Sequence, residues 1–279
     1  MNLLILCRAW NALFAAAVCI YSFYIAGATV HIETATGGSP YMHAIGIFFL
    51  LCFANVHNDI VDFEIDKINR PKRPLPSGKI SLRTAYAVMF ACLFLAIGFG
   101  FEFAWLFVAV SALCFVYNKF LKGLPLAGNF MVALLTTTPI AIPILKFGFP
   151  QPELLNLMFF AFTLTFAREI TKDIEDMKGD KALGLKTIPV LLGVKFSLVL
   201  VFLCEIQCLA QLAMFKLPVF FAILPCLLLS AVLACLNKIR LSQTMIKVAM
   251  VAGLVAFYCV CYSPSIMSPK LTGSPLMLK

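Results

Sequence analysis

The sequence predicts an all-α, polytopic membrane protein with about nine transmembrane helices. Of its 279 residues, 62% are hydrophobic and only 13% are charged, which leaves too little polar surface to cover a soluble globule of this size. Runs of about 20 apolar residues recur along the chain, and each can cross roughly 30 Å of hydrocarbon. The runs are continuously apolar and do not alternate, which favours helices over a β-barrel.

The first expected helix, 9–30, follows Arg8 and contains Asn11, and no small-residue cleavage site comes after it. We therefore expect it to be retained and not removed as a signal peptide. The tail 263–279, rich in Ser, Pro and Lys, is expected to be disordered. The remaining apolar runs predict helices over 42–57, 82–100, 103–118, 126–145, 153–171, 188–214, 217–236 and 244–262.

Basic residues predict the orientation, since Lys and Arg near helix ends stay on the cytoplasmic side. With the N-terminus inside, nearly all of them lie on that side, which leaves only Lys146, Lys216, Lys270 and Lys279 outside. The net charge of +9 then belongs to one face. Such a face suits anionic membrane lipid, an anionic substrate or both, and it does not imply nucleic acid.

Acidic residues gather in two segments at the cytoplasmic ends of the second and sixth expected helices. These segments hold nine of the 13 acidic residues, and both contain the spacing D-x-x-D-x-x-x-D. Residues at i, i+3 and i+7 share one helical face, so each motif is expected to present three carboxylates in a row. Like charges in a row become favourable around a divalent cation, and Mg²⁺ prefers such oxygen ligands and bridges to phosphates. The two motifs are Asp59, Asp62 and Asp66, and Asp173, Asp176 and Asp180.

Cationic residues between the motifs can neutralise a diphosphate and so make it a good leaving group. A proline-stiffened loop supplies Arg70, Lys72 and Arg73, and Lys119, Lys122 and Lys186 lie elsewhere on the cytoplasmic side. A single acidic run can equally be a solvated helix end, but the repeated spacing at the membrane edge favours a binding site.

An internal repeat is also indicated, because Asn11 begins the first helix and Asn129 the fifth, each roughly 45 residues before its acidic motif. Either asparagine alone is also typical of an interhelical hydrogen bond. We expect one domain with two four-helix repeats, about 1–120 and 121–240, and an extra helix, about 244–262.

These motifs resemble the UbiA superfamily of intramembrane prenyltransferases over nearly the whole chain. The first signature is Asn58-Asp59-x-x-Asp62-x-x-x-Asp66 followed by Arg70-Pro71-x-Arg73-Pro74-Leu75-Pro76-Ser77-Gly78. The second is Asp173-x-x-Asp176-x-x-Gly179-Asp180 followed by Gly184-x-Lys186-Thr187. The opening Arg8-x-x-Asn11 is similar to the superfamily's Arg-Pro-x-Asn, with Ala9 in place of proline.

The resemblance implies two Mg²⁺ ions held by the six motif aspartates, of which Asp62, Asp66, Asp176 and Asp180 would be catalytic. The prenyl diphosphate would lose its diphosphate to give an allylic cation that an acceptor traps. Its substrates would be bound by Arg8, Asn11, Asn58, Arg70, Lys72, Arg73, Tyr117, Lys122, Asn129, Lys172 and Lys186.

The segment from Arg168 to Asp180, followed by Thr187-Ile188-Pro189, looks most like the digeranylgeranylglyceryl phosphate synthases of ether-lipid synthesis. That likeness implies geranylgeranyl transfer to geranylgeranylglyceryl phosphate, with no protein partner. An aromatic acceptor such as 4-hydroxybenzoate or homogentisate, or chlorophyllide, remains an alternative with the same donor chemistry. A transporter is a further alternative, although transporters place charges near the membrane centre and these acids lie at helix ends.

Overall fold

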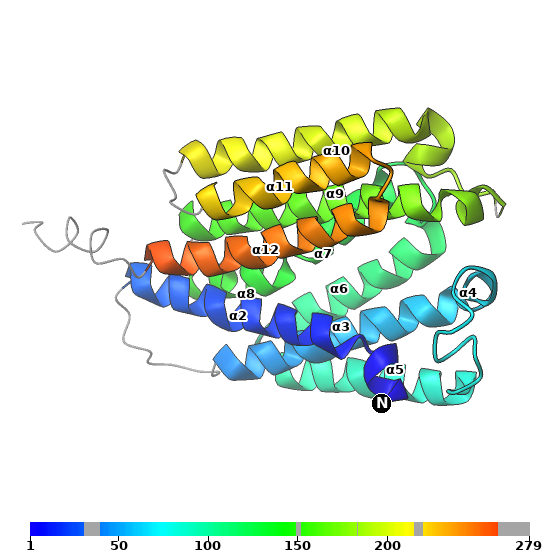
Figure 1. Ribbon diagram of the computed structural model, residues 1–279. Helices are drawn as coiled ribbons and strands as arrows, with labels where there is room; N and C mark the ends of the chain where they lie inside the picture. Colours follow the sequence, from blue (N-terminus) through cyan, green and yellow to red (C-terminus); the bar gives the residue numbers. More distant parts are fainter. Residues whose placement is uncertain (31–39, 149–151, 183, 215–219, 262–279) are drawn as a thin grey trace, which may run out of the picture.

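The computed structural model describes residues 1–30, 40–148, 152–182, 184–214 and 220–261, and every regular element among them is a helix. The long helices run side by side in one elongated bundle (Figure 1). In chain order the first part contains α1 (Asn2–Leu6), α2 (Ala9–Val30), α3 (Pro40–Val61), α4 (Phe63–Asn69), α5 (Leu82–Phe99), the 3-10 turn η1 (Phe101–Phe103), α6 (Ala104–Val116) and the π-helical turn η2 (Tyr117–Leu121). The second part contains α7 (Ala127–Leu135), α8 (Thr138–Phe147), α9 (Pro152–Ala182), α10 (Ile188–Met214), α11 (Phe220–Cys235) and α12 (Ile239–Cys261).

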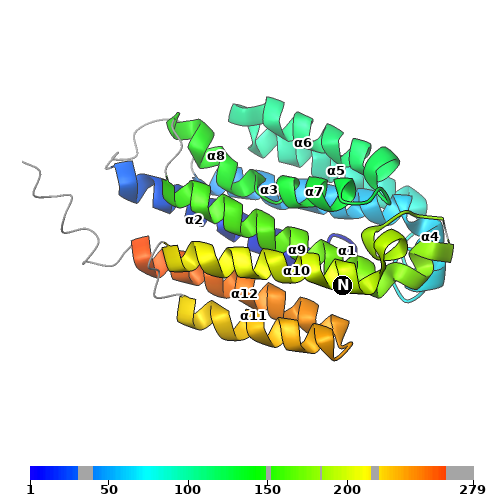
Figure 2. The same cartoon turned by 90° about the horizontal axis from the view of Figure 1, so that it is seen from above.

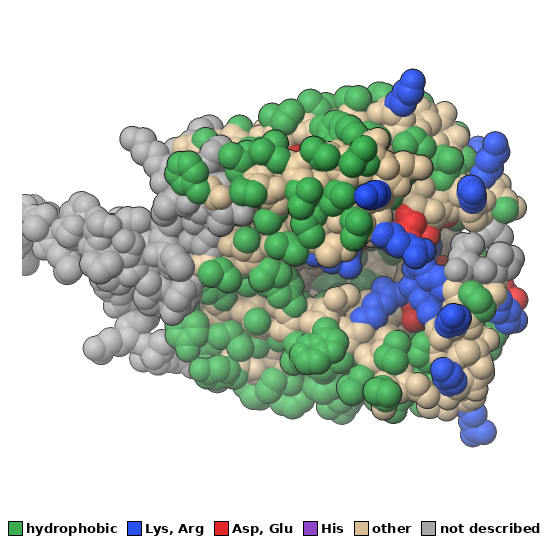
Figure 3. Space-filling view, in the orientation of Figure 1, with side chains coloured by type: hydrophobic (Ala, Val, Ile, Leu, Met, Phe, Trp, Pro, Cys, Tyr) green, Lys and Arg blue, Asp and Glu red, His purple; other side chains and the backbone are tan. Residues whose placement is uncertain are grey.

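Six of these helices are long and apolar enough to cross a membrane, and the bent pair α7 and α8 makes a possible seventh crossing among the described residues. Large apolar side chains cover the outside of the bundle, including Trp10, Phe90, Phe94, Trp105 and Phe221 (Figure 3). Lipid is the solvent that accommodates such a surface. The protein is therefore a multi-pass membrane protein.

The expected helices over 9–30 and 188–214 agree with α2 and α10. The single fifth helix expected over 126–145 is wrong, because α7 and α8 are bent by 51°. Thr136 and Thr137 lie at the break and donate their hydroxyls to backbone carbonyls one turn earlier. Pro139 follows at the start of α8, and proline offers no backbone N–H to continue a helix. The predicted tail 263–279 lies outside the described residues.

Two buried apolar clusters hold the bundle together. One centres on Phe53 of α3, Met89 of α5 and Phe107 of α6. The other centres on Phe160 of α9 and Ile246 of α12, and helices α2 and α8 contribute to both clusters. Figure 2 places α5 and α6 on one side of the bundle and α11 and α12 on the other. The first part, residues 2–121, and the second, residues 127–261, therefore meet along α2 and α8.

Both acidic motifs lie at the same end of the bundle, which we call the motif end. Helix α4, the loop of residues 70–81, the turn η2 and the last turns of α9 meet there (Figure 1). Lysine and arginine side chains concentrate at this end around a few acidic side chains (Figure 3). The fold thus brings segments that are more than 100 residues apart in the sequence to one place, as the Arg70–Asp176 contact illustrates.

Candidate active site

A polar pocket opens at the motif end between the two parts of the bundle. The first part contributes the α3–α4 junction, and the second contributes the last turns of α9 and the start of α7. Most of the residues predicted from the sequence line it, namely Arg8, Asn58, Asp62, Asp66, Arg70, Tyr117, Lys122, Asn129, Lys172, Asp173, Asp176 and Asp180.

The first motif spans the junction of two helices. Helix α3 ends at Val61, and Asp62 precedes α4, so the chain turns within the motif. Asp62 and Asp66 line the pocket, whereas Asp59 does not line it and accepts a 2.6 Å hydrogen bond from Arg8 Nη2. Helical bonding nevertheless continues across this turn, from Asp62 N–H to Asn58 O at 2.9 Å and from Asp66 N–H to Asp62 O at 2.7 Å. Asp59 and Asp66 both pair with Arg73, so they keep the common side that their spacing predicts, although only Asp66 of the two lines the pocket.

The second motif is helical throughout, because α9 continues to Ala182 instead of ending near 171 as expected. Asp173, Asp176 and Asp180 all line the pocket. Asn129 Nδ2 donates to Asp173 Oδ2 at 2.7 Å, and the Thr187 hydroxyl lies 3.2 Å from Asp180 Oδ2. The side chains of α7 and of the segment before α10 thus orient two of the three carboxylates.

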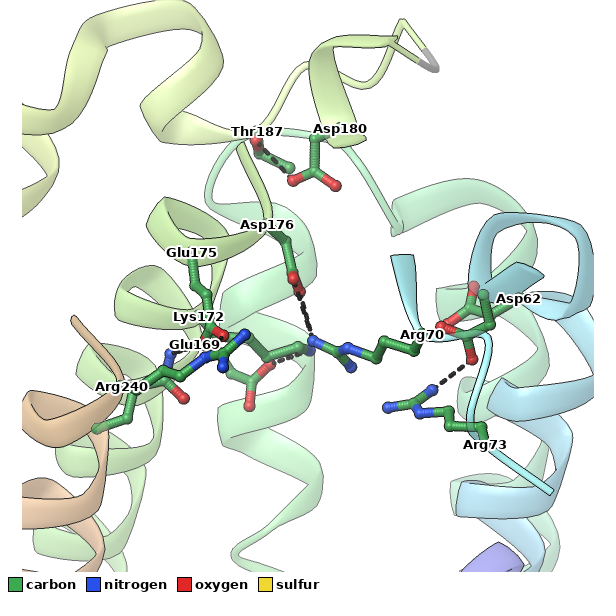
Figure 4. A network of polar contacts seen from close by, with 12 residues as sticks. Asp62, Arg70, Arg73, Glu169, Lys172, Glu175, Asp176, Asp180, Thr187 and Arg240 are labelled. Atoms are coloured by element: carbon green, nitrogen blue, oxygen red, sulfur yellow. Dashed lines mark hydrogen bonds and ion pairs between the residues drawn. The ribbon is translucent and has the colours of Figure 1, made fainter. Parts of the chain in front are cut away.

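Two cationic side chains form ion pairs inside the pocket, and each joins one motif to a segment distant in the sequence. Arg70 Nη2 donates to both carboxylate oxygens of Asp176, at 3.1 and 2.9 Å (Figure 4). Lys122 Nζ pairs with Asp62 and donates to Asn58 Oδ1 at 3.1 Å. The pocket therefore alternates carboxylates with cations, which limits the repulsion among the buried acids.

The turn η2 positions Lys122. The backbone N–H of Lys122 donates to the carbonyl oxygen of Tyr117, five residues earlier, at 2.8 Å. This is the π-helical hydrogen-bond pattern, which is often found at functional sites. The next turn is strained, since Leu126 has φ of 64° although it is not glycine. A Cβ on Gly128 would lie only 2.9 Å from the carbonyl oxygen of Leu121, so only glycine fits where α7 passes this turn.

Five predicted residues lie elsewhere. Asn11 and Lys186 are exposed and do not line the pocket. Lys72 lines a neighbouring pocket. Arg73 also lines that neighbouring pocket, and it pairs with Asp59, the fifth residue outside the first pocket, and with Asp66.

A model of the UbiA prenyltransferase family matches residues 16–251 of the chain. The chain belongs to this family.

Among relatives of this UbiA chain, a digeranylgeranylglyceryl phosphate synthase of Methanobrevibacter smithii is 39% identical over 167 residues, which cover 56% of this chain and 59% of that protein. Another protein of that name, from Methanopyrus kandleri, is 35% identical over 218 residues, which cover 73% of this chain and 80% of that one. The match thus spans less than two thirds of the first relative. A UbiA homolog from Archaeoglobus fulgidus, solved bound to GPP and Mg²⁺, has the same fold with a TM-score of 0.64 at 19% identity, over 94% of this chain and 100% of that one.

Sequence reasoning missed Glu169 and Thr187 as pocket residues of this UbiA chain. Glu169 is 4% exposed and accepts hydrogen bonds from Arg168 and, at 3.0 Å, from Lys172. Its spacing of three residues before Lys172 is one helical turn, a signal that could have suggested the pair. By holding the Lys172 ammonium, Glu169 positions a cation that faces the pocket.

The donor atoms of the pocket fit a hard divalent cation beside an anion. Five aspartates and the amides of Asn58 and Asn129 offer oxygen ligands of the kind that Mg²⁺ prefers. Within the described residues no three acidic, histidine or cysteine side chains stand together as a ready metal cluster. Each of the five lining aspartates instead accepts a hydrogen bond from a cation or a neutral donor. Burial raises the pKa of Asp66, although Arg73 favours its charged form. Burial likewise lowers the pKa of Lys122, against the attraction of Asp62.

Proposed function

We propose that this UbiA chain is a magnesium-dependent prenyltransferase that transfers a geranylgeranyl group from its diphosphate to geranylgeranylglyceryl phosphate. One observation carries the proposal: carboxylates of both motifs line one pocket together with Arg70, Lys122 and Lys172. A pocket with both oxygen ligands and cations suits a metal-bound diphosphate. The relatives' name, digeranylgeranylglyceryl phosphate synthase, supports the acceptor, and the GPP and Mg²⁺ bound to the Archaeoglobus fulgidus homolog support the donor.

In this proposal the five motif aspartates that line the pocket would hold magnesium, which would neutralise diphosphate charge and so improve the leaving group. Arg70 and Lys122 bind the non-bridging oxygens of the diphosphate, and Lys172 adds a third cation that Glu169 keeps in place. Asp59 acts indirectly, because its bonds to Arg8 and Arg73 fix the arginines around the first motif.

The proposed reaction is a nucleophilic substitution at the first carbon of the prenyl chain. The bond from that carbon to the diphosphate oxygen breaks, and both electrons leave with the diphosphate. The acceptor's hydroxyl oxygen then bonds to the allylic cation and forms an ether. The hydroxyl proton passes to the released diphosphate or to a motif aspartate.

We also infer that the motif end faces the cytoplasm and that the chain crosses the membrane nine times. The concentration of Lys and Arg at the motif end supports this orientation (Figure 3). Six described helices already meet the length and hydropathy needed, and the bent pair, the shorter apolar segment of α11 and helix α12 would supply the remaining crossings. Two repeats, about 1–120 and 121–240, in a single domain agree with the contribution of one motif from each part of the bundle.

The test is a prenyl-transfer assay with the full chain in nanodiscs, magnesium and radiolabelled geranylgeranyl diphosphate. Geranylgeranylglyceryl phosphate, 4-hydroxybenzoate and homogentisate are offered as separate acceptors. We expect product from the glycerol phosphate alone. Product from an aromatic acceptor alone would keep the prenyl transfer and overturn the acceptor, and no product from any acceptor across donor lengths would overturn the enzyme.

A matched pair of variants tests whether activity depends on a carboxylate inside the pocket and not on any carboxylate of this segment. Asp62→Asn removes a carboxylate charge inside the pocket. Glu64→Gln removes one from an exposed side chain two residues later, which pairs with Lys67. We expect Asp62→Asn to lower kcat/KM by roughly 100-fold or more and Glu64→Gln to change it less than about twofold. Equal effects would contradict the assigned site.

A further inference from the structure

A second pocket of about 420 Å³ lies beside the first at the motif end. Helix α1 and the loop of residues 70–81, which we call the basic loop, form its walls. The side chains that matter for its chemistry are Asn2, Ile5, Arg70, Lys72, Arg73 and Lys79. Arg70 lines both pockets, so they adjoin at this residue.

The charged side chains of this second pocket are all positive. Among the residues that the structure describes, four cations and no acidic side chain line it. Arg70 and Arg73 each direct one guanidinium nitrogen to the aspartates of the first pocket. Lys72 and Lys79 form no ion pair with any described carboxylate, so their charge remains for a ligand. An anion is the ligand that such a pocket favours.

The basic loop is built in advance of any ligand. Backbone bonds from Arg73 N–H to Arg70 O at 3.0 Å and from Ser77 N–H to Arg73 O at 3.0 Å fold it into successive turns. Gly78 reverses the chain with φ of 74°. Three prolines further reduce the freedom of this segment. The lysines are therefore presented by a rigid frame, which lowers the entropy lost on binding.

Helix α1 indicates that the anion belongs to an amphiphile. Its side chains Leu3, Leu4 and Ile5 remain 48%, 63% and 54% exposed, although the helix lies at the charged end of the bundle. Exposed apolar residues beside cations are typical of the membrane interface, where a lipid keeps its headgroup in water and its chain in hydrocarbon. Ile5 itself forms part of the pocket wall.

We propose that this second pocket binds the phosphate monoester of the lipid acceptor, with Lys72 and Lys79 as its main contacts. The inference rests on the function proposed above. In a glycerol phosphate only a few carbon atoms separate the phosphate from the free hydroxyl. A phosphate held beside Arg70 therefore leaves the hydroxyl directed toward the first pocket, where the donor binds. The sequence predicted that Lys72 binds the diphosphate of the donor, whereas here we propose that it binds the phosphate of the acceptor.

The experiment compares Lys72→Gln/Lys79→Gln with the control Lys195→Gln, which removes an exposed lysine of α10 that lines neither pocket. Steady-state kinetics are measured in neutral phosphatidylcholine nanodiscs, and binding of radiolabelled geranylgeranylglyceryl phosphate is measured by equilibrium dialysis of the same nanodiscs. We expect the double variant to raise the acceptor KM and the acceptor Kd by roughly 5- to 30-fold, and to change the donor KM by less than about twofold. The control should change neither.

Other outcomes overturn the proposal. An unchanged acceptor KM and Kd would show that the lysines do not bind the acceptor, and an equal rise in both KM values would return them to the diphosphate. Repeating the assay with phosphatidylglycerol added tests bulk lipid as the source of the phosphate. If anionic lipid alters the wild-type rate but not that of the double variant, while the acceptor KM is equal in both, the pocket binds bulk lipid. Should wild type make no product from this acceptor, the proposed function fails, and the dialysis still decides whether the pocket binds the phosphate.

Discussion

Replacing Lys122 with methionine tests how the motif end is held together. The substitution keeps the apolar stem and removes the ammonium that pairs with Asp62 and donates to Asn58. Asp62, 8% exposed, would then keep one hydrogen bond, from Asn58 Nδ2 at 2.9 Å. Breaking a fully buried pair costs about 3–5 kcal/mol, because an uncompensated charge stays behind. The side chains of Lys122 and Asp62 are 23% and 11% exposed, so solvent screens part of their interaction. We therefore expect the free energy of unfolding to fall by about 2 kcal/mol.

The stability assay is equilibrium unfolding in mixed detergent and SDS micelles, with Lys119→Met as the control. Lys119 belongs to the same turn, but its ammonium lies over the Phe120 ring, on the outside. We expect the control to change stability by less than about 0.5 kcal/mol. The double variant Lys122→Met/Asp62→Asn removes both partners of the pair. Its loss in the free energy of unfolding should be smaller than the sum of the two single losses by about 1 kcal/mol.

The same variant tests the chemistry. If Lys122 binds the departing diphosphate, Lys122→Met should lower kcat/KM by roughly 100- to 1,000-fold. Loss of stability with full activity would limit Lys122 to a structural role. Stability and activity equal to those of Lys119→Met would refute the reasoning altogether.

Three further predictions follow from the pocket and its turn. Asn129→Leu removes the donor to Asp173 and should lower magnesium-dependent activity by roughly 10- to 100-fold, whereas Asn11→Leu, at the exposed repeat position, should stay within about twofold in the same assay. Gly128→Ala should cost about 1–3 kcal/mol in the unfolding assay, because its Cβ would lie 2.9 Å from a backbone oxygen. Gly98→Ala, whose Cβ would meet nothing within 4 Å, should be neutral or stabilising, and equal effects would contradict the close packing at η2. Chelation of magnesium should abolish prenyl transfer and its return should restore it, while activity that survives chelation would contradict the assigned role of the aspartates.

The two asparagines show where sequence reasoning about the site reached its limit. Asn11 and Asn129 occupy matching positions in the expected repeat, yet only Asn129 reaches an aspartate. In the first part Arg8 bonds Asp59 instead, from a residue with φ of 48° between α1 and α2. A repeat in sequence predicts similar elements, but it does not predict that both copies use the same side chain.

The sequence by itself determined the fold class, the family and most residues of the pocket. Hydrophobic runs and a repeated spacing of aspartates are local patterns, so they can be read without knowing which helices touch. The tertiary structure decided which partner each charge takes, as with Arg70 and Asp176, which lie 106 residues apart. It also decided that Asp59 does not line the first pocket and that Lys72 and Arg73 line a second one. Such choices depend on packing between distant segments, which a local pattern does not specify.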